Sequence, residues 1–192
     1  GEIVSLVKEG EGLVAGIISF YKGEPEVTFD RGISFPVKLC GKGLFLDALK
    51  VITDKNPLPF ITGTICAHHC MDKCMRNHYE SPVDVRGTKL VAAEAAYDEL
   101  MALTEPVEPT NGKLAVIGGG PGGLSAAYYL ALMGHHVAIY EKRQKLGGMM
   151  RYGIPSYRFP RELLDAEIES ILSLGIEVHT GVKMGNEISF DE

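Results

Sequence analysis

The stretch Leu114-Ala-Val-Ile-Gly118-Gly-Gly120-Pro-Gly-Gly123-Leu-Ser-Ala-Ala127 decides the fold of the second half of this chain. An apolar run ends in the pattern G-x-G-x-x-G and continues into small residues, which predicts a β-strand, a tight turn and a helix. Backbone N–H groups at the start of such a helix can hold a pyrophosphate. The segment therefore predicts a dinucleotide site.

Each glycine of this pattern has a physical task. Gly118 permits the tight turn, Gly120 lets the backbone approach the pyrophosphate, and Gly123 lets the helix pack closely on its strand. The candidate binding residues of the turn are Gly118, Gly120, Pro121, Gly122 and Gly123.

An acidic residue follows at the expected distance. Gly134 predicts the end of the helix, and residues 136–140 predict a second parallel strand. Glu141 ends that strand, where a carboxylate accepts hydrogen bonds from ribose hydroxyls and disfavours a 2′-phosphate. We count Glu141 and its neighbour Lys142 among the candidate cofactor-binding residues.

The next run is Glu141-Lys-Arg-Gln-Lys-Leu-Gly147-Gly148-Met-Met-Arg151-Tyr-Gly153-Ile-Pro155-Ser-Tyr-Arg158-Phe-Pro160. It resembles the flavin domain of the glutamate synthase small subunit family. This resemblance implies FAD as the dinucleotide and adds Gly148, Arg151 and Ile154 to the candidate cofactor-binding residues. The glycine spacing alone does not separate FAD from NAD, so an NAD-linked Rossmann enzyme stays an alternative.

A second motif precedes the first: Gly63-Thr-Ile-Cys66-Ala-His68-His69-Cys70-Met-Asp-Lys-Cys74-Met-Arg-Asn-His78. Thiols at intervals of four fall on one face of a helix, or surround a cluster if the segment is a loop. With no secretion signal before them, such clustered cysteines indicate metal ligands sooner than disulfides.

Asn56-Pro-Leu-Pro-Phe-Ile-Thr-Gly-Thr-Ile-Cys66 and the cysteine repeat resemble the iron–sulfur domain of the same family. Within that family, Leu39-Cys40-Gly-x-Gly and Asp54-Lys-Asn-Pro-Leu-Pro59 resemble the selenate reductase-type subunits most closely. The resemblance covers residues 39–180 and implies two [4Fe–4S] clusters, but the upstream cysteines of the family are absent. Three options stay open. The first is one [4Fe–4S] cluster held by Cys66, Cys70, Cys74 and a fourth ligand, which is either Cys40 or not a cysteine. The second is a zinc site that adds His68, His69 or His78 to the cysteines. The third is that the segment holds no metal.

The predicted fold class is α/β, with an N-terminal, mostly helical iron–sulfur-type domain before a truncated Rossmann-like FAD-binding domain with a parallel sheet. Residues 1–36 are unassigned and include two candidate strands, at 13–21 and 26–29. Helical spacing at 44–53 and 88–103 defines a cysteine-containing domain over 37–107. Residues 108–192 form the first part of the FAD/NAD(P)-binding domain, and we expect a fragment because the family continues further.

Charge and hydropathy exclude some partners. Nineteen basic and 25 acidic residues give a net charge of −6, which argues against a nucleic-acid surface. The longest apolar stretch, 13–21, is far short of the roughly 20 residues of a membrane span. We expect a soluble cytoplasmic protein.

The resemblance implies an electron-transfer oxidoreductase subunit. It would move electrons from NAD(P)H, bound by a domain missing here, through FAD to iron–sulfur centres and a partner subunit or domain. No catalytic acid–base residue is evident, and we expect this fragment alone to be inactive. The alternative from a different class is a non-catalytic, metal-stapled docking module.

Overall fold

The computed structural model describes residues 6–9, 12–21, 24–29, 34–105 and 107–185. These residues divide into two compact units. The first unit contains Gly1–Lys55 and Ala67–Tyr97, and the second contains Asn56–Cys66 and Asp98–Glu192. The second unit therefore includes a short segment that precedes the cysteine repeat in sequence.

The first unit begins with a three-stranded antiparallel sheet in the order β1-β2-β3. Its strands are β1 (Leu6–Glu9), β2 (Gly12–Tyr21) and β3 (Glu24–Phe29). Val7 is paired with Val14, and Ile18 with Val27. The sequence pattern indicated β2 and β3 but not β1, which has only four residues.

Four helices and one 3-10 turn follow among the described residues of the first unit. α1 (Ser34–Cys40) packs against α2 (Phe45–Thr53), and the apolar spacing of α2 buries Ala48 and Leu49 completely. α4 (His69–Asp72) and η1 (Met75–His78) follow, and then α5 (Val85–Leu103) continues into the second unit. The Asp84 carboxylate accepts a hydrogen bond from Gly87 N at 2.8 Å, which caps the start of α5.

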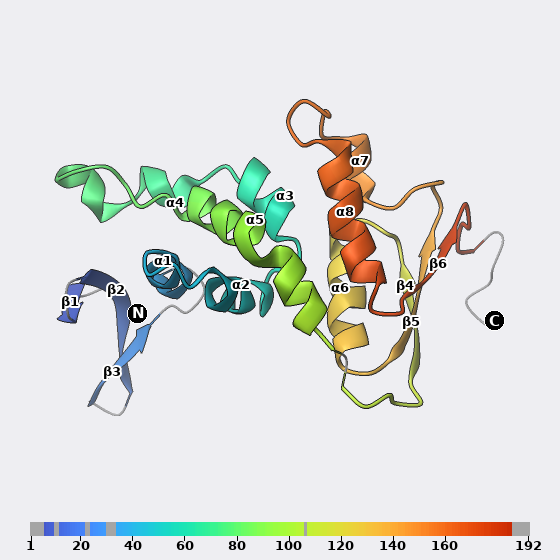
Figure 1. Cartoon of the computed structure of the whole chain (residues 1–192), viewed down its shortest axis with the longest axis horizontal. Coiled ribbons are helices and arrows are strands. Elements are labelled where there is room, and N and C mark those ends of the chain that lie inside the picture. Colours follow the sequence, from blue (N-terminus) through green and yellow to red (C-terminus); the bar gives the residue numbers. More distant parts are fainter. Residues whose placement is uncertain (1–5, 10–11, 22–23, 30–33, 106, 186–192) are drawn as a thin grey trace. The chain divides into compact units, whose positions relative to one another are not determined.

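The second unit contains a parallel sheet in the order β4-β5-β6 (Figure 1). The strands are β4 (Lys113–Ile117), β5 (His136–Glu141) and β6 (Glu177–Thr180). Two helices, α6 (Pro121–Leu132) and α8 (Arg161–Leu172), connect them, with the short α7 (Gly148–Tyr152) between β5 and α8. This arrangement confirms the predicted α/β class, with a Rossmann-like sheet after a mostly helical region.

The two faces of the parallel sheet differ. Val116, Val137 and Ile139 point toward the helices and are buried, whereas Ile117 on the opposite face is exposed. That opposite face borders a cavity of about 460 Å³ near the N-terminal ends of the strands, beside Lys113, His136 and Glu177. Because dinucleotides bind beyond the carboxyl ends of such strands, this cavity is separate from the glycine motif.

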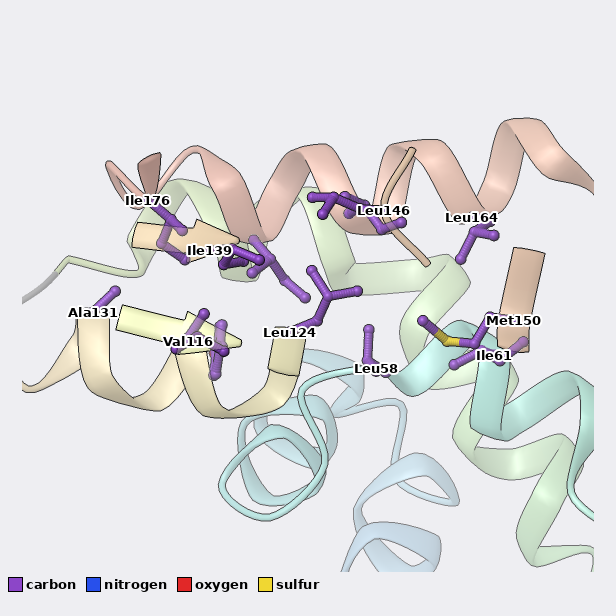
Figure 2. Packing of buried hydrophobic residues seen from close by; sticks show 14 of the residues in the cluster. Leu58, Ile61, Val116, Leu124, Ala131, Ile139, Leu146, Met150, Leu164 and Ile176 are labelled. Atoms are coloured by element: carbon purple, nitrogen blue, oxygen red, sulfur yellow. The ribbon is translucent and has the colours of Figure 1, made fainter. Parts of the chain in front are cut away.

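The core of the second unit includes residues from before the cysteine repeat. Figure 2 shows Leu58 and Ile61 beside Met150 and Leu164 in one hydrophobic cluster. Ile61 belongs to α3 (Pro59–Ile65), which packs against α8. The sequence predicted two consecutive domains with a boundary near residue 108. In the structure α3, which precedes that boundary, is part of the second unit.

Candidate dinucleotide site and cysteine segment

The glycine loop (residues 118–123) joins β4 to α6. Gly118 has φ +97°, a left-handed conformation that disfavours any other residue, and its N–H donates to the Tyr140 carbonyl at 2.8 Å. A Cβ on Gly123 would lie 1.8 Å from the Gly118 carbonyl oxygen. The close approach of helix and strand therefore requires glycine at position 123, as the motif predicts.

The first turn of α6 is open for a ligand. Pro121, which lacks an N–H, occupies the start of the helix, and it is exposed together with Gly122. A Cβ on Gly122 would meet nothing within 4 Å. The N–H groups of a first helical turn have no partner within the helix and lie at its positive end. The loop thus has the backbone geometry that suits a pyrophosphate.

A second pair of glycines packs on this loop. Gly147 has φ +113° and donates its N–H to the Gly119 carbonyl at 2.7 Å. Gly148 has φ +49°, and a Cβ there would lie 2.7 Å from Gly120 Cα. In the structure Gly148 approaches the glycine loop itself, and its predicted contact with a cofactor stays a prediction.

Glu141 lies beneath the loop and is only 6% exposed. One carboxylate oxygen accepts a hydrogen bond from Gly119 N at 2.7 Å, and the other accepts one from Arg143 N at 2.8 Å. Each oxygen keeps a second lone pair for a ribose hydroxyl. The carboxylate therefore fixes the loop to the end of β5, whereas its predicted bond to a ribose stays a prediction.

The Arg-Tyr-Gly-Ile-Pro turn (residues 151–155) is held by charged groups that the motif did not identify. The Arg151 side chain is 10% exposed, donates to the Leu146 carbonyl and pairs with Asp165 on α8. Arg161 donates to the carbonyls of Met150 at 2.8 Å and Ile154 at 2.6 Å. Arg151 thus has a structural task, and cofactor contacts by Arg151 and Ile154 stay predictions.

Lys142 and its neighbours form an exposed rim beside the glycine loop. Lys142 itself is exposed, and the Arg143 guanidinium lies 4.1 Å from the centre of the Tyr152 ring. The Tyr152 hydroxyl donates to the Lys145 carbonyl at 3.3 Å. Only Lys142 among these residues was predicted to bind the cofactor.

The cysteine segment (residues 66–78) is not one helix. α3 ends at Ile65, and Cys66 follows with an extended ψ of 131°. His68 has φ +46°, a left-handed conformation that is strained for a residue with a side chain. Cys70 lies in α4 and Cys74 lies between α4 and η1. The segment is therefore not the single helix that would place three thiols on one face; it consists of two short helical turns joined by irregular backbone. The alternative, in which the thiols surround a cluster, stays a prediction.

The donor atoms of this part of the chain are of the types that iron and zinc accept. None of the four cysteines forms a disulfide, and the buried Nδ1 of His68 has no hydrogen-bond partner. Within the described residues, however, no three His, Cys, Asp or Glu side chains gather as a metal site. The donor chemistry fits a cluster, but no coordination geometry is formed in this structure.

Cys40 differs from the three clustered cysteines. It ends α1, and its thiol lies 3.9 Å from the Thr88 carbonyl, toward which it donates. Burial raises the pKa of the Cys40 thiol, whereas a metal ligand must be a thiolate. These observations favour a packing role for Cys40, and its assignment as a fourth ligand stays a prediction.

The parallel sheet and the glycine loop define a Rossmann-like unit with a dinucleotide-binding type of turn, which follows a mostly helical, cysteine-containing region. Residues 32–100 match the family described as dihydropyrimidine dehydrogenase domain II, 4Fe-4S cluster. Residues 116–171 match the family described as NAD(P)-binding Rossmann-like domain. Both halves of the predicted architecture are confirmed.

Three relatives identify the wider group. The chain is 37% identical to the NADPH-Fe(3+) oxidoreductase subunit beta of Geobacter sulfurreducens over 77% of its length, which is 22% of that protein. It is 34% identical to the NADP(+)-dependent formate dehydrogenase subunit beta of Moorella thermoacetica over 78% of its length, which is 24% of that protein. It is 32% identical to the glutamate synthase [NADPH] small chain of Mycobacterium tuberculosis over 80% of its length, which is 32% of that protein.

The chain is therefore a homologue of the glutamate synthase small chain and of related oxidoreductase subunits, as the sequence motifs predicted. It spans between a fifth and a third of the length of these relatives. No helix among the residues placed by the structure is long and apolar enough to cross a membrane.

Proposed function

We propose that this chain is part of an electron-transfer oxidoreductase subunit that binds FAD at the glycine loop. The observation that carries the proposal is the glycine loop at the start of α6, with the buried carboxylate of Glu141 beneath it. The preceding residues match a 4Fe-4S family, so a flavin here would have an electron acceptor in the same chain.

FAD, when bound, accepts a hydride and releases electrons one at a time, which is chemistry that amino-acid side chains do not supply. The chain binds and orients the group. The N–H groups of Gly122 and Gly123 and the positive end of α6 hold the pyrophosphate, and Glu141 accepts from the ribose. The hydride donor, NAD(P)H, would bind in a part of the protein outside this chain.

We infer that Cys66, Cys70 and Cys74 supply ligands to one [4Fe–4S] cluster, which passes electrons to a partner subunit or domain. The support comes from their spacing and from the matched family. Two of the three relatives are beta subunits and one is a small chain, which supports a partner subunit. Cysteines without disulfides suit a reducing compartment, so we place the protein in the cytoplasm.

A non-catalytic docking module is the second candidate. One observation favours this candidate: in the described part of the chain, the side chains of the cysteine segment do not come together as a metal site. In that case the segment would hold zinc or no metal, and the Rossmann-like unit would serve as a scaffold between subunits.

The visible absorption spectrum of the chain, purified without oxygen and analysed for FAD, iron and acid-labile sulfide, separates these candidates. The electron-transfer proposal predicts flavin bands, or saturable uptake of added FAD, together with iron and sulfide. If the purified chain binds FAD but contains zinc or no metal, it is a flavoprotein and the proposed [4Fe–4S] cluster is overturned. A colourless chain that takes up no FAD would overturn the flavin proposal as well.

A further inference from the structure

A fully buried carboxylate connects α8 to α3. Glu167 lies on α8 and has no exposed surface. One of its oxygens accepts a hydrogen bond from Phe60 N at 2.7 Å, and the other accepts a longer one from Ile61 N at 3.3 Å. These two N–H groups are in the first turn of α3, where no helical carbonyl is available to them.

The contact joins segments that are 107 residues apart in sequence. A buried carboxylate is costly unless hydrogen bonds satisfy it, and the positive start of a helix is a favourable place for its charge. A nonpolar side chain would fill the same space without this directional bond. Glu167 therefore specifies where the start of α3 lies on α8.

The packing around the carboxylate makes α3 a fixed part of the second unit. Leu58 and Ile61 are buried in the same cluster as Leu124, Met150 and Leu164 (Figure 2). Cys66 directly follows α3 and groups with the second unit. The first cysteine of the repeat is thus attached to the unit that carries the glycine loop.

The same helix also holds the turn that follows the glycine loop. Asp165 pairs with Arg151, and Arg161 donates to the carbonyls of Met150 and Ile154. One face of α8 therefore fixes the Arg-Tyr-Gly-Ile-Pro turn, while Glu167 fixes α3. α8 therefore contacts both the Arg-Tyr-Gly-Ile-Pro turn and α3 through side-chain hydrogen bonds.

We propose that Glu167 is a positioning residue that fixes Cys66 relative to the dinucleotide site through α3. The functional meaning of this inference rests on the proposed FAD and cluster, because a fixed cysteine ligand would hold the cluster at a set distance from the flavin. The positioning itself is a property of the polypeptide and can be tested without either cofactor.

The test measures the distance between two spin labels in the full chain, free of cofactor. One label is attached to Cys66 after replacement of Cys40, Cys70 and Cys74 by Ser, and the second to the exposed rim through Lys142→Cys. The proposal predicts a narrow distance distribution, which broadens in Glu167→Gln because an amide accepts only one of the two N–H bonds. Glu169→Gln, an exposed glutamate on the same helix, is the matched control and keeps the narrow distribution.

Hydrogen exchange provides a second measurement. Above pH 7, where Glu167 is ionised, the Phe60 and Ile61 amides are expected to exchange about ten to a hundred times faster in Glu167→Gln, since a bond to a charged acceptor is lost. Unchanged exchange with an unchanged distance distribution would overturn the proposal. If Glu167→Gln does not fold, Glu167→Asp replaces it, because the aspartate side chain is one methylene shorter. We expect Glu167→Asp to broaden the distance distribution. A distribution as narrow as that of the unsubstituted chain would overturn the proposal.

The FAD and iron contents of the unsubstituted chain are measured separately. They decide the proposed function, whereas the label distances decide the role of Glu167, so failure of one is distinguishable from failure of the other.

Discussion

Gly148 lies so close to Gly120 that a Cβ on Gly148 would be 2.7 Å from Gly120 Cα. Two turns that are separated in sequence by α6 and β5 therefore pack backbone against backbone, and the hydrogen bond from Gly147 N to the Gly119 carbonyl joins them. The shape of the glycine loop depends on this contact as well as on its own sequence.

Gly148→Ala should destabilise the second unit. The new methyl group would meet backbone atoms that cannot rotate away, and φ +49° is strained for alanine. We expect a loss of about 1–3 kcal/mol in the free energy of unfolding. Urea unfolding checks it, with Gly41→Ala as control because a Cβ there makes only ordinary contacts, at 3.5 Å and beyond. Equal stability of the two variants would contradict the expectation.

Gly123→Ala and Gly122→Ala should separate the folding role of the loop from its binding role. A Cβ at Gly123 would collide with the Gly118 carbonyl, so we expect a loss of about 1–3 kcal/mol or more in stability. A Cβ at Gly122 meets no protein atom, so the thermal unfolding midpoint should not change. If the pyrophosphate lies against this turn, Gly122→Ala weakens FAD binding without destabilising the fold. Unchanged FAD affinity in Gly122→Ala would place the cofactor elsewhere.

Glu141→Gln should loosen the glycine loop. The carboxylate accepts from Gly119 N and Arg143 N, and a neutral amide group offers one oxygen for two donors. Leaving a buried donor without its partner costs about 1–3 kcal/mol. We expect a lower unfolding midpoint and weaker FAD binding than in Glu162→Gln, an exposed site on α8. Midpoints that agree between the two variants would show that Glu141 does not hold the loop.

The stability of the second unit should depend on pH through Glu167. Burial raises the pKa of this carboxyl from 4.5 to about 7, and the bonds from Phe60 and Ile61 oppose the rise only in part. The folded chain therefore holds this proton more tightly than the unfolded chain. The contribution of the protonated Glu167 carboxyl to the free energy of unfolding is therefore fully present below pH 4.5, and it is lost as the pH rises to about 7.

One unit of pKa corresponds to about 1.4 kcal/mol, so the loss between pH 4.5 and 7 is on the order of 3 kcal/mol. Urea unfolding across this range, compared between the unsubstituted chain and Glu167→Gln, isolates the contribution. The difference between their free energies of unfolding should change with pH over this interval and level off above it. A constant difference would show that Glu167 does not titrate there.

Local patterns predicted the parts of the site that one stretch of chain determines. The G-x-G-x-x-G spacing predicted β4, the turn and α6, and the steric role of Gly123 followed from the motif. Apolar periodicity also predicted α2 and α5, although α5 begins three residues earlier than expected because Asp84 caps it.

Other features depend on contacts between distant segments and left no local signal. The resemblance to the flavin family implied a cofactor contact for Arg151, but its partner Asp165 and the role of Arg161 appear only once α8 is in place. Glu167 looked like one more polar residue on an amphipathic helix, because its partners precede it by more than a hundred residues. The break at His68 was equally unpredictable, since it depends on one left-handed backbone conformation.

Equilibrium dialysis of the chain against FAD and, separately, against NAD tests the central claim most directly. The account predicts saturable binding of FAD, weakened by Gly122→Ala, with no comparable binding of NAD. Binding of NAD in preference to FAD would make this an NAD-linked Rossmann domain, and binding of neither would contradict a dinucleotide site at the glycine loop.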